Sequence, residues 1–118
     1  MIGFVGVSNP AQAKSFYRDT LGLTLVSEDQ FALVFNAAGT MLRVSLVAAV
    51  VPASYTVLGW QVDDIAETIV GLAAKGVTFE RYGFMQQDQL GIWQAPGGTK
   101  VAWFKDPDGN LLSVSQFA

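Results

Sequence analysis

The chain has 118 residues, of which 51% are hydrophobic and 14% charged, a composition that excludes intrinsic disorder and fits one ordinary domain. It contains neither cysteine nor histidine, which excludes disulfides, thiol catalysis, a serine–histidine–aspartate triad and imidazole-bound metals. Seven basic and ten acidic residues give a net charge of −3, so nothing in the charge balance favours a nucleic-acid partner.

We expect neither a targeting segment nor a membrane segment in these residues. The first residues of the chain have no cationic region and no long apolar run, so a signal peptide is not expected. Residues 44–62 are uncharged and long enough to raise the question of a membrane span. Pro52 interrupts them, and β-branched neighbours such as Val47 and Val57 favour two strands joined by a turn. We therefore expect a cytoplasmic protein without a membrane partner.

The first half of the chain predicts a strand, a helix and three further strands. After a strand at 4–7, Asn9 is a suitable helix N-cap, Pro10 suits the first helical position, and Gln12 stands at the capping-box position. Gly22 is expected to end the helix. The apolar face of the helix consists of Ala13, Phe16, Tyr17 and Leu21. Further strands are expected at 22–25, 31–35 and 39–45.

The second half repeats this order, which is the pattern of an internal duplication. A strand at 56–62 leads to a helix with Asp64 as N-cap and Gly76 at its end. The apolar stripe of this helix consists of Ile65, Ile69 and Leu72. Strands are expected at 76–79, 101–105 and 109–115, with extra residues within 83–99. The turn at 106–110 is typical of a β-hairpin.

These two halves predict an α+β fold made of two βαβββ modules. We assign residues 1–49 to the first module, 50–54 to a linker and 55–118 to the second module, all within one domain spanning 1–118.

Residues 16–23 read Phe-Tyr-Arg-Asp-Thr-Leu-Gly-Leu, and residues 103–110 read Trp-Phe-Lys-Asp-Pro-Asp-Gly-Asn. The first of these segments resembles the helix end of the vicinal oxygen chelate superfamily of glyoxalases, bleomycin-resistance proteins and extradiol dioxygenases. Residues 103–110 resemble its Asp-Pro-Asp-Gly-Asn hairpin, and residues 62–65 resemble the start of its second helix. The resemblance covers essentially the whole chain. It implies two modules whose sheets curl into a mixed sheet around a cup, in a homodimer.

The resemblance also implies where a catalytic metal would bind. In metal-dependent members, four positions in the cup carry histidine, glutamine or glutamate. By motif register, these positions correspond here to Ile2, Arg43, Val57 and Ser113. None of these residues is a normal ligand of a catalytic divalent metal. We therefore expect no metal and no cofactor, and a mechanism that uses a metal as a Lewis acid is disfavoured.

Strand alternation predicts which side chains face the cup. The expected inward sets are Ile2, Phe4 and Gly6; Met41, Arg43 and Ser45; Val57, Gly59 and Gln61; and Leu111, Ser113 and Ser115. Such a surface is apolar with few polar groups, which suits a mostly apolar small molecule that can carry an anionic group. The ligand-binding candidates are Phe4, Arg43, Gln61, Tyr82, Trp93, Trp103 and Ser113.

Two of these features have alternative interpretations. Arg43 is either an anion clamp or half of a structural ion pair with Glu80, Asp88 or a neighbouring subunit. The segment 82–99 is either a lid over the cup or, as we favour, a long β-hairpin or dimer contact. The sequence does not decide which face Trp93 and Trp103 use.

Three functions remain open, and the sequence identifies neither the ligand nor a catalytic residue. The first is metal-independent binding of a small molecule, as in bleomycin-resistance proteins. The second is a glyoxalase-like lyase, isomerase or dioxygenase with an atypical or absent metal site. The third is a subunit or regulatory partner that shares only the fold.

Overall fold

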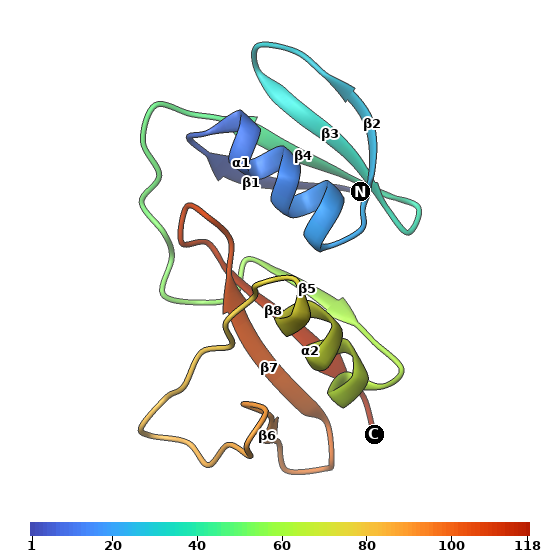
Figure 1. Cartoon of the computed structure of the whole chain (residues 1–118), viewed down its shortest axis with the longest axis vertical. Coiled ribbons are helices and arrows are strands. Elements are labelled where there is room, and N and C mark those ends of the chain that lie inside the picture. Colours follow the sequence, from blue (N-terminus) through green and yellow to red (C-terminus); the bar gives the residue numbers. More distant parts are fainter. The chain divides into compact units, whose positions relative to one another are not determined.

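The computed structural model describes all 118 residues, and the chain divides into two compact units. The first unit contains Met1–Ala53 together with Asp106–Asn110, and the second contains Ser54–Lys105 together with Leu111–Ala118. Each unit has a four-stranded sheet and helical structure on one face of that sheet, as Figure 1 shows. The predicted α+β class with two βαβββ modules is confirmed.

The first unit holds a mixed sheet with the strand order β1-β4-β3-β2. The strands are β1 (Ile2–Val7), β2 (Thr24–Glu28), β3 (Ala32–Ala37) and β4 (Thr40–Leu46). Strand β1 runs parallel to β4, and the other pairs are antiparallel. The core of this unit contains Val5, Val7, Leu33, Phe35, Leu42 and Val44, all of them buried.

The helix of the first unit begins as the sequence predicts. Asn9 caps it, because the side-chain oxygen of Asn9 accepts a hydrogen bond from the backbone N–H of Gln12 at 3.1 Å. Helix α1 (Pro10–Lys14) then widens into a π-helical stretch, η1 (Ser15–Thr20). This widening lies around the fully buried Tyr17 and was not expected from the sequence pattern.

The second unit has the corresponding sheet, with the strand order β5-β8-β7-β6. The strands are β5 (Leu58–Gln61), β6 (Trp93–Gln94), β7 (Lys100–Lys105) and β8 (Leu111–Gln116). Asp64 caps helix α2 (Ile65–Ala74) by accepting from the backbone N–H of Glu67 at 3.0 Å, as predicted. The core of this unit contains Ile65, Ile69, Ala102, Phe104, Leu112 and Val114.

The edge of the second sheet differs from the prediction. The strand expected at 76–79 is reduced to one bridge between Phe79 and Phe104, and the edge resumes only at β6. The expected long hairpin therefore contains two pairs, Trp93 with Val101 and Gln94 with Lys100. The backbone N–H of Glu80 still donates to the carbonyl oxygen of Trp103 at 2.8 Å, and residues 81–92 then leave the sheet. The side chain of Gln87 binds three backbone groups of this loop and its ends.

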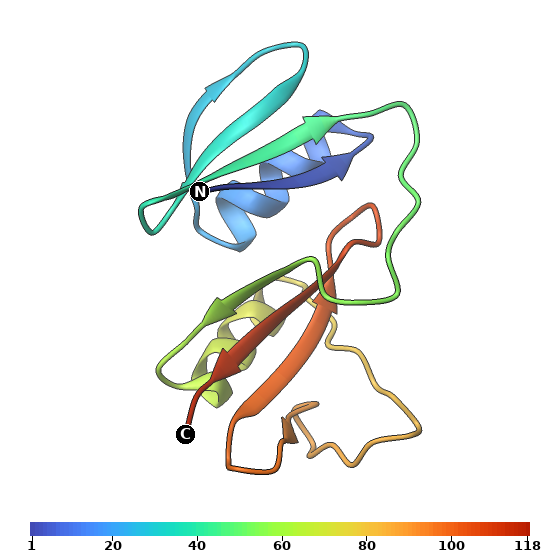
Figure 2. The same cartoon turned by 180° about the vertical axis from the view of Figure 1, so that it is seen from behind.

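Each sheet has a face that its helix does not cover, here called the open face. Figure 2 views the chain from behind and shows the strands of each sheet in front of its helix. None of the helices combines the length and the apolar character that spanning a bilayer requires.

Candidate functional site

A row of three residues crosses the open face of the second sheet. Gly59 on β5 pairs in register with Ser113 on β8, and Ser113 pairs with Trp103 on β7. Their sequence neighbours Ala102, Phe104, Leu112 and Val114 are buried on the opposite face. Side-chain alternation therefore brings the side chains of Ser113 and Trp103 together on the open face.

Three aromatic side chains form a cluster beside this row, here called the aromatic wall: Tyr82, Trp93 and Trp103. The ring centroids of Tyr82 and Trp103 lie 5.7 Å apart in an edge-to-face arrangement. Those of Trp93 and Trp103 lie 6.1 Å apart. Trp103 also donates a hydrogen bond from Nε1 to Oγ1 of Thr56 at 3.1 Å, which orients its indole ring. The strand register shows which face the two tryptophans use. Trp93 pairs with Val101, and Val101 lies two residues before Trp103 on β7, so both tryptophans lie on the open face.

Ser113 lies beside the aromatic wall, because it pairs in register with Trp103. The residue is only 6% exposed, and its hydroxyl has no hydrogen-bond partner within the chain. Gly59 leaves the space opposite it open, since a Cβ atom at residue 59 would lie 2.8 Å from the Ser113 Oγ. An unbonded hydroxyl next to aromatic rings can give or accept a hydrogen bond from a ligand.

We expect Gly59→Ala to destabilise the fold by about 1–3 kcal/mol, because the added methyl group meets the Ser113 hydroxyl. Urea unfolding of the single variants Gly59→Ala and Ser113→Ala and of the double variant measures the effect. In the double variant the clash is removed. Its loss of unfolding free energy should therefore be clearly smaller than the sum of the losses in the two single variants. Additive losses would contradict the close approach of residues 59 and 113.

The loop at 80–92 positions two members of the aromatic wall. The side-chain oxygen of Gln87 accepts from the backbone N–H of Tyr82 at 2.8 Å. Its Nε2 donates to the carbonyl oxygens of Glu80 at 3.0 Å and Gly91 at 2.9 Å. The half-buried amide of Gln87 thus bonds backbone groups at both ends of the loop in place of strand pairing, which explains why these residues do not extend the sheet.

A second set of bonds closes the same loop. Asp88 Oδ1 accepts from the backbone N–H groups of Leu90 and Ile92, both at 2.9 Å. The guanidinium group of Arg81 donates to the carbonyl oxygens of Asp88 and Gln89. The roles of Arg81 and Gln87 were not predicted, because the only sequence signal for this loop is a polar run between apolar segments. These bonds hold Tyr82 and Trp93 at the two ends of a defined loop.

The phenol of Tyr82 is neutral at ordinary pH. Burial raises its pKa above the usual value for tyrosine, and the negative charge of Glu80 raises it further. Glu80 itself pairs with Lys105 at 3.3 Å. The aromatic wall therefore presents uncharged rings and a phenol hydroxyl.

The remaining candidates occupy different places. Gln61 lies at the exposed end of β5, opposite Ser115 on β8. Phe4 and Arg43 belong to the first sheet, where they pair in register on β1 and β4. Of the seven candidates, the structure thus brings together Tyr82, Trp93, Trp103 and Ser113 on one face.

Arg43 is half-buried on the open face of the first sheet, and Phe4 beside it is 61% exposed. Arg43 makes no hydrogen bond or close ion pair within its own unit, although its positive charge also acts on the carboxylate of Asp29. The two carboxylates considered as its structural partners are used elsewhere, Glu80 by Lys105 and Asp88 by its own loop. A guanidinium without an ion-pair partner in its unit can bind an anionic group.

The four positions at which the resemblance implies metal ligands do not fit a divalent metal. Ile2 and Val57 supply only alkyl side chains, and Arg43 is cationic, which leaves the neutral hydroxyl of Ser113 as the one oxygen donor. Nowhere in the chain do three acidic side chains gather closely enough to hold a metal ion.

The comparisons with known proteins agree with this fold. A model of the Glyoxalase/Bleomycin resistance protein/Dioxygenase superfamily matches residues 3–114. A solved member of this superfamily from Sphaerobacter thermophilus DSM 20745 is 26% identical, with a TM-score of 0.75 over 98% of this chain and 96% of that chain. No curated protein matches the sequence.

Two further solved structures share the fold at lower identity. Lactoylglutathione lyase from Agrobacterium tumefaciens is 19% identical, with a TM-score of 0.76 over 98% of this chain and 91% of that chain. A glyoxalase family protein from Enterococcus faecalis is 23% identical, with a TM-score of 0.74 over 95% and 92% of the two chains. The matched motifs, the two modules and the family model lead to one conclusion: the chain belongs to the Glyoxalase/Bleomycin resistance protein/Dioxygenase superfamily.

Proposed function

We propose that the chain is a metal-independent binding protein that holds a mostly apolar small molecule against the open face of the second sheet. The observation that carries this proposal is the aromatic wall beside the unbonded hydroxyl of Ser113. Flat aromatic faces bind apolar and aromatic groups, while one or two polar groups fix the orientation of the ligand.

The state of the acidic side chains supports binding rather than general acid–base catalysis. Glu80 pairs with Lys105, and Asp88 accepts two backbone hydrogen bonds in its own loop. A general base needs a carboxylate that can reach the proton of a substrate. Glu80 thus already has an ion-pair partner, and Asp88 lies on the side of Trp93 away from its ring, with one carboxylate oxygen used by the loop.

The chemistry of the four positions described above supports metal independence. One neutral hydroxyl, one guanidinium and two alkyl groups provide no first coordination shell for a Lewis-acid metal. The proposal also retains the homodimer and the cytoplasmic location expected from the sequence and the resemblance.

A fluorescence titration tests the proposed binding. The probe is 1-anilinonaphthalene-8-sulfonate, which is mostly apolar and anionic, added to untagged protein treated with a chelator. We expect saturable binding at one equivalent per chain that quenches tryptophan emission and persists without metal. Trp60→Phe is the matched control, because Trp60 pairs with Val114 on the face toward α2 and should bind the probe as the parent does. Absence of saturable binding to the folded protein would contradict the proposal.

A further inference from the structure

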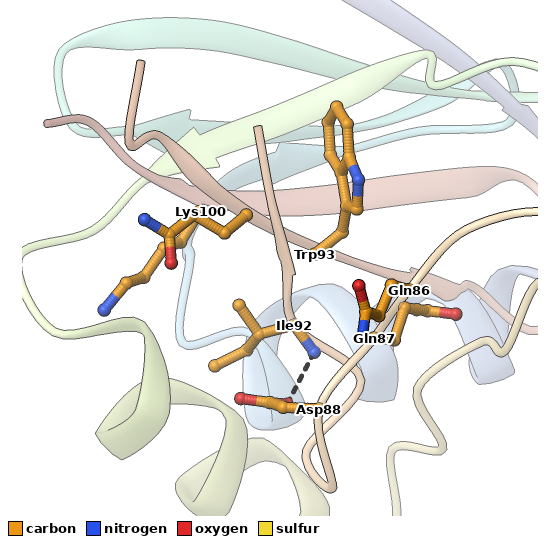
Figure 3. Close-up of a pocket in the computed structure, with 7 residues that line it drawn as sticks. Gln86, Gln87, Asp88, Ile92, Trp93 and Lys100 are labelled. Carbon is orange, nitrogen blue, oxygen red and sulfur yellow. Dashed lines mark hydrogen bonds between the residues drawn. The ribbon is translucent and has the colours of Figure 1, made fainter. Parts of the chain in front are cut away.

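A hollow in the second unit, here called the loop hollow, lies between the loop 80–92 and the β6–β7 hairpin. Its volume is about 470 Å³, within the usual range of small-molecule sites. It is lined by Gln86, Gln87, Asp88, Ile92, Trp93, Gln94 and Lys100, most of which Figure 3 labels.

The loop hollow and the aromatic wall share one residue, Trp93, whose ring is directed to the side of the wall. Side chains alternate along β6, so the neighbours of Trp93 point to the side opposite its ring. Figure 3 shows the indole of Trp93 directed away from Asp88 and from the side chain of Ile92. Lys100 pairs with Gln94, one residue from the Trp93–Val101 pair, and therefore also faces away from the wall. A ligand in the loop hollow would not compete for the open face.

The polar groups that line the hollow divide into those with structural partners and those without. Gln87 uses both ends of its amide for the loop backbone, and Asp88 uses Oδ1 for two backbone N–H groups. The ammonium group of Lys100 and the second carboxylate oxygen of Asp88 have no hydrogen-bond partner in the chain. The hollow therefore contains one cationic and one anionic group that remain available to a ligand.

These two opposite charges do not pair with each other, although they line the same hollow. A ligand with one charge would satisfy only one of them. A ligand with a carboxylate and an ammonium group can bind Lys100 and Asp88 at the same time through charge-assisted hydrogen bonds. The buried side chain of Ile92 offers apolar contact between them, and the exposed amides of Gln86 and Gln94 are further polar groups at the hollow.

We propose that the loop hollow is a second ligand site, selective for a small zwitterion such as a free α-amino acid. The carboxylate of the ligand binds the ammonium group of Lys100, and its ammonium group binds the outer carboxylate oxygen of Asp88.

The test is a titration of ¹⁵N-labelled full-length protein followed by amide chemical shifts. The probes are L-leucine and L-glutamine, with N-acetyl-L-leucine and L-leucinamide as derivatives that each lack one charge. We expect the amides of residues 86–94 and 100 to shift with a Kd of about 1 mM or tighter for at least one amino acid. Each single-charge derivative should bind at least about tenfold more weakly.

Two variants and two controls connect the shifts with the proposed contacts. Lys100→Gln and Asp88→Asn should each weaken binding about tenfold, and Asp88→Asn keeps the side-chain oxygen that closes the loop. Lys75→Gln and Asp63→Asn remove charges from exposed residues of the same unit and should change nothing. The proposal is wrong if neither amino acid shifts these amides at about 20 mM, if the derivatives bind equally well, or if both hollow variants bind as the parent does. If amino acids do not bind the loop hollow, the proposed function is unaffected, because that function is tested by probe binding beside Trp103 and Ser113.

Discussion

Replacing Asp106 with alanine is expected to destabilise the first unit by about 3 kcal/mol or more, the largest effect of any single substitution considered. Asp106 lies in the turn between β7 and β8, yet this turn belongs to the first unit. Its carboxylate is 5% exposed and accepts four hydrogen bonds. Removal of the carboxylate leaves several buried donors without a partner, which is more costly than the loss of one bond.

The four bonds come from three residues. The hydroxyl of Tyr17 and the side-chain amide of Asn110 each donate to Asp106 Oδ2 at 2.8 Å. The backbone N–H groups of Asp108 and Asn110 donate to Oδ1 at 3.0 and 2.8 Å. Asn110 also donates to the carbonyl oxygen of Gly6, which ties the turn to β1. The network therefore connects the turn, the π-helical stretch and the first strand.

Urea unfolding of Asp106→Ala measures this effect, with Asp29→Ala as the control. Asp29 also accepts backbone bonds in a turn, from Phe31 and Ala32, but it is exposed. Its replacement should cost clearly less. An unfolding midpoint for Asp106→Ala equal to that of Asp29→Ala would contradict the buried network.

The same network predicts a pH dependence of stability in the alkaline range. Burial raises the pKa of Tyr17 far above its ordinary value of about 10, and the negative charge of Asp106 raises it further. The folded state keeps this phenol protonated while the unfolded state loses the proton, so the stabilising contribution is complete below pH 10 and falls as the pH rises above it. One proton of difference corresponds to a loss of about 1.4 kcal/mol per pH unit.

The alkaline effect is measured as the difference between the parent and Tyr17→Phe, which share all other titrating groups. Tyr17→Phe should lose about 1–2 kcal/mol at neutral pH, because Asp106 loses one donor. Above pH 10 its stability should fall less steeply than that of the parent. Parallel pH profiles would show that Tyr17 does not remain protonated in the folded state.

For ligand binding, the largest expected effect is that of Trp103→Ala. Trp103 is the one member of the aromatic wall that contacts both of the others, Tyr82 and Trp93. Truncation of a central aromatic residue of a binding site commonly costs 2–4 kcal/mol, so affinity for the naphthalene probe should fall about 100-fold. The measurement is the same fluorescence titration, read by probe emission.

Two variants separate the loss of the ring from general damage to the fold. Trp103→Phe keeps an aromatic ring but loses the hydrogen bond to Thr56, so its affinity should lie between those of the parent and the alanine variant. Trp60→Phe should bind as the parent does. Unchanged affinity in a folded Trp103→Ala protein would place the ligand away from the aromatic wall.

The features predicted correctly from sequence are those that depend on neighbouring residues. Asn9 and Asp64 cap the two helices through side-chain bonds three residues away, as their spacing predicts. The turn at 106–110 joins β7 and β8 as expected. Each of these features is determined by residues that are close together in the sequence.

The features that were missed depend on contacts between distant residues. The π-helical stretch lies around Tyr17, whose hydrogen-bond partner Asp106 is 89 residues away in sequence. The edge strand of the second sheet is interrupted because Gln87 binds backbone groups at both ends of a loop. Residues 106–110 were expected only as a turn, although Asp108 also accepts hydrogen bonds from the backbone N–H and the hydroxyl of Ser8. Local patterns contain no signal for such pairs.

Alternation along strands predicted the composition of the open face, but not its arrangement. It placed Ser113 and Gly59 in inward sets, and pairing across β5, β8 and β7 then put them in one row with Trp103. The orientation of the tryptophans depends on this register, which only the assembled sheet provides.

Native mass spectrometry of the untagged protein tests metal-independent binding most directly. The protein is incubated with Zn²⁺, Ni²⁺, Mn²⁺ or Fe²⁺, desalted, and then offered the naphthalene probe. We predict a mass without stoichiometric metal, one probe per chain whether or not metal was offered, and loss of the probe adduct in Trp103→Ala. One tightly held metal ion per chain, together with probe binding that requires it, would contradict the account and return the chain to metal-dependent chemistry.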